Sequence, residues 1–121
     1  MSKVYEIKRA RKASQLLRII SSLFYQTVRD DKQLDGLSIT RIDLSPDKSN
    51  CRILFYIQGG PEAFKEKMQQ LILYKPSLRA ALSKAIPGRY TPELVFKFDD
   101  SFEKSQRMES IITELKEKGE I

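Results

Sequence analysis

Hydrophobic residues recur along this chain at two different spacings. Residues 6–29 place apolar or small side chains three and four positions apart, which predicts an amphipathic helix. Residues 51–57 and 93–98 alternate apolar side chains with others, which predicts two strands. Another strand is predicted at 37–44, where the alternation changes phase near Thr40. This change of phase indicates a β-bulge or a strand that is buried on both faces.

Proline residues punctuate the region between the second and third predicted strands. Apolar residues return at helical spacing over 64–72 and again over 78–86. Pro61 suits the first turn of a helix. Because Pro76 lacks an N–H and clashes with the preceding turn, it predicts a kink or a break between the two stretches. Ser77 is a candidate cap for the helix that restarts after it.

A last helix is predicted near the C-terminus. Asp99, Asp100 and Ser101 are candidate N-caps for it. Residues 116–121 are expected to fray. The apolar stripe of this helix consists of Met108, Ile111, Ile112 and Leu115.

The predicted order of elements is therefore α-β-β-α-kink-α-β-α. A length of 121 residues suits a single domain that covers the whole chain. The loop between the first two strands is short enough to predict an antiparallel hairpin, and the third strand follows a helical crossover. We expect an α+β fold in which helices cover one face of a three-stranded sheet. The other face is then free for solvent or a partner.

Composition excludes several classes of active site. The chain has no histidine, which removes His-based general-base catalysis and most zinc enzyme sites. The single cysteine, Cys51, excludes an internal disulfide and alternates in phase with apolar neighbours, as a buried side chain would. The acidic pairs at 30–31 and 99–100 suit turn and cap positions better than metal-assisted hydrolysis.

Several further motifs are absent from the sequence. It contains no phosphate-binding glycine loop, no cofactor motif and no apolar run long enough to span a membrane. We therefore expect no enzymatic activity, no cofactor, no metal, no small-molecule substrate and no membrane partner. The single cysteine indicates a reduced, cytoplasmic location.

Charge is distributed unevenly around a formal net charge of +6. Residues 1–92 hold 17 basic and 8 acidic side chains, net +9, whereas residues 93–121 hold 5 basic and 8 acidic, net −3. A basic body with an acidic end indicates a polyanionic partner such as nucleic acid, with a solvated basic surface as the alternative. The candidate phosphate ligands lie on or beside the predicted helices and are Lys8, Arg9, Arg11, Lys12, Lys75, Arg79, Lys84 and Arg89.

Five local motifs, in one order, span nearly the whole chain. They are the Arg-Asp-Asp turn at 29–31, the hairpin at 42–55, the Leu-Arg-x-x-Leu stretch at 78–82, the segment 89–99 and the Arg-Met pair at 107–108. The segment 89–99 is the most specific of them and resembles the pattern R-x-x-P-E-L-x-F-x-x-D. Together the motifs resemble ribosome-binding factor A, a bacterial family of ribosome-assembly proteins.

This resemblance implies a KH-like fold of type II order with an added C-terminal helix. It also implies a non-catalytic factor that binds the immature small (30S) ribosomal subunit and its 16S rRNA. Such proteins support late maturation of the subunit, including processing of the rRNA ends. The family places an Ala-x-Gly kink between two helices, and the matching positions here are Tyr74, Lys75 and Pro76. Glycine lets an RNA backbone approach closely and these residues do not, so the kink is expected without that close contact.

A different class of function is also compatible with the sequence. The acidic C-terminal helix is a candidate docking surface for another protein, which would make the chain an interaction adaptor. We expect a monomer in either case. A salt titration separates the two hypotheses, because phosphate contacts weaken steeply with salt.

Overall fold

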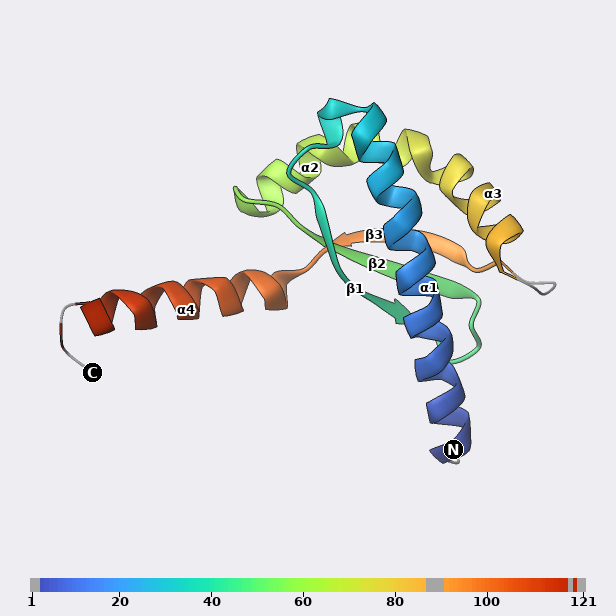
Figure 1. Ribbon diagram of the computed structural model, residues 1–121, viewed down its shortest axis with the longest axis horizontal. Coiled ribbons are helices and arrows are strands. Elements are labelled where there is room, and N and C mark those ends of the chain that lie inside the picture. The colour runs from blue at the N-terminus through green and yellow to red at the C-terminus, as the bar shows by residue number, and fades with distance from the viewer. Residues whose placement is uncertain (1–2, 87–90, 118, 120–121) are drawn as a thin grey trace.

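The computed structural model describes residues 3–86, 91–117 and 119, and its helices and strands follow the predicted order (Figure 1). Two short 3₁₀ turns, labelled η, are added to that order. The elements are α1 (Lys3–Asp30), η1 (Lys32–Leu34), β1 (Ser38–Leu44), β2 (Asn50–Tyr56), α2 (Gly60–Leu71), η2 (Ile72–Tyr74), α3 (Lys75–Ala85), β3 (Glu93–Phe98) and α4 (Asp100–Glu117).

The three strands form one mixed sheet with β2 in the centre. β1 pairs with β2 in antiparallel register, as the short hairpin loop predicts, and β3 pairs with β2 in parallel register after the helical crossover. The register shifts between Ile39 and Arg41, so the change of phase near Thr40 corresponds to a β-bulge.

One hydrophobic cluster lies between the sheet and the first three α-helices. Helix α1 contributes Leu16, Ile20 and Phe24, which are four residues apart and therefore share a face. From the sheet, Phe55 is fully buried, and its ring centroid lies 5.3 Å from that of Phe24 and 5.7 Å from that of Phe96. Both pairs are edge-to-face, the arrangement that aromatic rings prefer. The helices thus cover one face of the sheet, as the sequence predicts.

The predicted interruption of the second helical region is the turn η2. Pro76 is the second residue of α3, where a missing N–H costs no helical hydrogen bond. The helix therefore restarts before the proline, and Ser77 is not its cap: Tyr74 holds the N-cap position without a side-chain hydrogen bond. Of the three predicted kink residues, Tyr74 ends η2, whereas Lys75 and Pro76 open α3.

The turn η2 is tied to the end of α1 by a carboxylate. The Tyr74 hydroxyl donates to Oδ2 of Asp31 at 2.6 Å, and Nε2 of Gln70 donates to the same oxygen at 2.7 Å. The hydrogen bond from Tyr74, followed by that from Gln70, lowers the pKa of the Asp31 carboxyl below its usual value. These bonds connect the end of α2 and the turn η2 to Asp31, the residue that follows α1 and caps η1.

Removing the Tyr74 hydroxyl is expected to lower stability in a pH-dependent way. A carboxyl whose pKa is depressed in the folded state stabilises the fold above its unfolded pKa, and this stability is lost as the pH falls through the folded pKa. Tyr74→Phe should therefore lower the urea midpoint at about pH 7, and its difference from the parent should narrow below about pH 4. Tyr25→Phe is the control, because the Tyr25 ring is exposed. A difference that persists unchanged to low pH would contradict the role given to Asp31.

Candidate nucleic-acid interface

Basic side chains gather at one end of the sheet. The last residue of β1, Leu44, lies opposite Cys51, which in turn lies opposite Leu94 near the start of β3. The end of β1 and the beginnings of β2 and β3 therefore share one edge of the fold. The first turns of α1 and the length of α3 lie toward this edge, whereas α4 leaves from the opposite end (Figure 1).

The first predicted cluster occupies the early turns of α1. Lys8 and Arg11 are exposed there, and Arg9 and Lys12 are half-buried. Arg9 lines a hollow whose other wall is the end of β1 at 42–44. This cluster therefore includes one residue at the sheet and two that face solvent on the projecting part of the helix.

The second predicted cluster lies on α3, against the start of β3. Nζ of Lys75 is 3.8 Å from Oε1 of Glu93, and Nε of Arg79 is 3.7 Å from Oε2 of the same carboxylate. Nη2 of Arg79 also donates to the carbonyl oxygen of Thr91 at 3.2 Å. Lys84 is exposed farther along the helix, and Arg89 lies outside the described residues.

Glu93 belongs to this cluster in the structure, although the sequence does not predict it there. Its spacing from the lysine and the arginine is not helical, and the charge count places it in the acidic part of the chain. The parallel pairing of β3 with β2 brings it there, together with a hydrogen bond from its backbone N–H to the carbonyl of Ser49 at 2.9 Å. The sequence feature that could have drawn attention to Glu93 is its place in the Pro-Glu-Leu motif of the segment 89–99.

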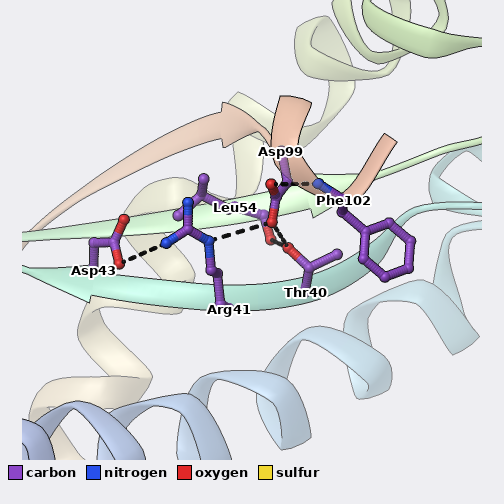
Figure 2. Close-up of polar contacts among 6 residues, drawn as sticks. All are labelled: Thr40, Arg41, Asp43, Leu54, Asp99 and Phe102. Carbon is purple, nitrogen blue, oxygen red and sulfur yellow. Dashed lines mark hydrogen bonds and ion pairs between the residues drawn. The ribbon is translucent and has the colours of Figure 1, made fainter. Parts of the chain in front are cut away.

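A buried carboxylate, that of Asp99, joins three elements at the opposite end of the sheet (Figure 2). The backbone N–H of Phe102 donates to its Oδ1 at 3.0 Å, so Asp99 is the N-cap of α4 among the three candidates, Asp99, Asp100 and Ser101. The hydroxyl of Thr40 donates to Oδ2 at 2.5 Å, and Nε of Arg41 donates to the same oxygen at 3.4 Å. These two contacts with the bulge of β1 are not predictable from the sequence pattern.

The ionisation of Asp99 reflects opposing effects. Burial acts to raise its pKa, but the hydrogen bonds from Thr40 and Phe102 and the charge of Arg41 outweigh burial, so the pKa lies below the usual value. Arg41 also contacts Oδ1 of Asp43 at 3.3 Å. With two carboxylates against its guanidinium, Arg41 is less suited to bind phosphate than the cations at the other end of the sheet.

Helix α4 leaves its apolar stripe uncovered. Met108 is 62% exposed, Ile111 is 55% exposed and Ile112 is 41% exposed. The helix runs away from the sheet at the end of β3, so the stripe does not reach the core (Figure 1). Amphipathic spacing predicted the helix correctly, but it did not predict that the apolar face would be exposed.

The other reactive group of the chain is the thiol of Cys51. Cys51 is buried, and burial raises the pKa of its thiol to about 11, which keeps it protonated near neutral pH. Among the described residues, no three acidic, cysteine or histidine side chains are grouped closely enough to hold a metal ion. Within the same part of the chain, no helix combines the length and apolarity needed to cross a membrane.

Comparison with known sequences identifies one family. The sequence model of the family described as ribosome-binding factor A matches residues 8–112. A ribosome-binding factor A from Syntrophomonas wolfei is 34% identical over 113 residues, which is 93% of this chain and 93% of that protein. The protein of the same name from Dictyoglomus thermophilum is also 34% identical over 113 residues, covering 93% of this chain and 92% of its own.

Two solved structures share the fold. The crystal structure of ribosome-binding factor A from Thermus thermophilus aligns with a TM-score of 0.60 at 24% identity, covering 73% of this chain and 92% of the other. A solution structure from Thermotoga maritima, of a protein proposed to be a ribosome binding factor A, gives 0.63 at 26% identity and covers 74% and 84%. With the mixed sheet and its helices, they confirm the expected α+β, KH-like class.

Proposed function

Because the chain belongs to the ribosome-binding factor A family, we propose that it binds the immature small (30S) ribosomal subunit by contacting 16S rRNA. Its role is to support late maturation of that subunit, including processing of the rRNA ends. It performs no catalysis itself and acts in the cytoplasm as a monomer. Recognition rests on the shape of the RNA and on its phosphates rather than on base edges.

The observation that supports this proposal is the separation of charge along the sheet. Arg9 from α1 and Lys75 and Arg79 from α3 flank the end where β2 and β3 begin. The acidic α4 starts at the other end (Figure 1). A phosphate backbone is attracted to the first end and repelled from the second, which orients the protein on RNA.

The RNA contact in this proposal is made by side chains of α3 and not by the backbone of η2. The Tyr74 hydroxyl donates to Asp31, and Pro76 stands where the family has the glycine of its kink, so this turn lacks the close backbone approach that glycine would allow. Lys75 and Arg79 are one helical turn apart and can reach phosphates without such a close approach.

Sedimentation of cell extracts tests the proposal. We expect the protein to travel with free small subunits and to be scarce on translating ribosomes, because a maturation factor must leave before translation begins. Extracts fractionated at low and at high salt serve as paired measurements, since phosphate contacts should be lost at high salt. Equal occupancy of free subunits and translating ribosomes would contradict the assembly role.

The exposed stripe of α4 supports a second candidate function, that of an interaction adaptor. Met108, Ile111 and Ile112 form an apolar surface on a helix with acidic flanks, which suits a protein partner better than RNA. Binding through this stripe should resist salt, whereas binding through α3 should weaken with it. A complex with small subunits that is insensitive to salt would favour the adaptor.

A further inference from the structure

The side chain of Glu93 sits where a bound phosphate would be expected. It lies between the two cations of α3, with one carboxylate oxygen directed to Lys75 and the other to Arg79. A carboxylate and a phosphodiester each carry one negative charge and can each bridge a pair of cations. Glu93 therefore partly neutralises the charges of Lys75 and Arg79 in the free protein, before RNA binds.

The geometry indicates that this contact is weak enough to be exchanged. Both N–O distances exceed normal hydrogen-bond lengths, and the Glu93 side chain is 55% exposed. Exposed ion pairs of this kind contribute little to stability, because water and salt screen them. The position of Glu93 nevertheless persists, since its backbone is fixed by pairing with Asn50 and by the bond to Ser49.

We propose that Glu93 is a tethered competitor for RNA phosphate at the Lys75–Arg79 pair, an inference that rests on the proposed function. In the free protein the carboxylate occupies the pair, and an RNA phosphate must displace it to bind. Because the competitor is part of the chain, its local concentration is high and does not depend on dilution. Glu93 therefore lowers the affinity of the basic end for phosphates in general and favours RNA that makes several contacts at once.

Neutralising the competitor should strengthen binding. Glu93→Gln keeps the size of the side chain and the backbone hydrogen bonds while it removes the charge. Oligo-uridine of fixed length is a suitable probe, because it offers phosphates without structure. At about 0.1 M salt we expect binding roughly three- to tenfold tighter than that of the parent. The slope of log affinity against log salt should steepen by roughly 0.7, the value of one phosphate contact with a single strand.

A matched control separates a local effect from a change in net charge. Glu109→Gln makes the same change of charge on α4, where the side chain is exposed and far along the chain from α3. It should alter the affinity by less than about twofold, since distant surface charges are screened. In a Lys75→Gln/Arg79→Gln background, Glu93→Gln should bring no gain, because the cations that it frees are then absent.

Three results would overturn the inference. They are equal effects of the Glu93 and Glu109 variants, weaker binding by Glu93→Gln, and a gain that survives in the background without the two cations. If the glutamine variant disturbs the fold, Glu93→Ala is measured in its place. If the parent protein binds free small subunits but the Glu93 variants bind oligo-uridine no more tightly than the parent, only the competitor role fails. If the parent does not travel with small subunits, the proposed function fails instead.

Discussion

Reversing the charge of both Arg79 and Lys84 to glutamate should weaken binding to free small subunits by roughly 25- to 60-fold at about 0.1 M salt. This range corresponds to the loss of two phosphate contacts, each of which contributes roughly 0.7 to 0.9 to the salt slope. Arg79→Glu also places a second carboxylate beside Glu93, so the surface between α3 and the start of β3 becomes negatively charged. The slope of log affinity against log salt should become shallower by about two contacts.

The control for this double reversal has the same change of charge in a different place. Lys104→Glu/Lys116→Glu alters two exposed residues of α4 and should change subunit binding only slightly. Arg79 and Lys84 are exposed, so their reversal should change the free energy of unfolding by no more than about 1 kcal/mol. If the Arg79/Lys84 variant folds and binds as tightly as the parent at every salt concentration, α3 is not the RNA-binding face. Lys8 and Arg11 on α1 are then the next residues to test.

Replacing Asp99 with alanine should reduce the free energy of unfolding by about 2–3 kcal/mol. The change removes the cap of α4 and the buried acceptor that Thr40 and Arg41 share, which leaves Thr40 with the carbonyl oxygen of Leu54 at 3.3 Å and Arg41 with Asp43 (Figure 2). Asp99 is only 3% exposed, so water does not readily replace its bonds to Thr40 and to the N–H of Phe102, whereas the half-exposed Arg41 can turn to solvent. Urea denaturation near neutral pH measures the effect.

Two further variants and a pH series refine this result. Asp99→Asn retains an oxygen that can cap the helix but loses the charge, so its cost should be smaller than that of alanine. Asp100→Ala changes an exposed neighbour and should cost at most about 0.5 kcal/mol. Because the pKa of Asp99 is depressed in the folded state, its stabilisation is present above its unfolded pKa and is lost as the pH falls through the folded value. A cost for Asp99→Ala no larger than that for Asp100→Ala would contradict the structural role of Asp99.

The sequence was sufficient to predict the parts of the fold that depend on near neighbours. Amphipathic spacing predicted the helices and strands, and the change of phase near Thr40 corresponds to the bulge. Asp99 follows the last strand, and its capping role is a local one. The resemblance at 89–99 added the family and the fold class, which spacing alone does not provide.

Contacts between segments far apart in the chain could not be predicted from the spacing of apolar residues. The bond between Thr40 and Asp99 joins residues 59 positions apart, and the bond between Asp31 and Tyr74 joins residues 43 positions apart. Glu93 reaches α3 only because β3 pairs with β2. Periodicity assigns a face to each helix but does not say what covers that face, which is why the exposure of the α4 stripe was not predicted.

Because α4 projects from the sheet, its backbone hydrogen bonds and those of the sheet are expected to open at different rates. Strand β2 lies between two partners, so its backbone amide hydrogens are released to solvent only when the sheet itself opens. The backbone bonds of α4 lie within the helix and face water, and the cap at Asp99 fixes only its first turn. We therefore expect the amide hydrogens of the far turns of α4 to exchange with solvent faster than those of β2. A partner that binds α4 can then stabilise those turns without opening the sheet.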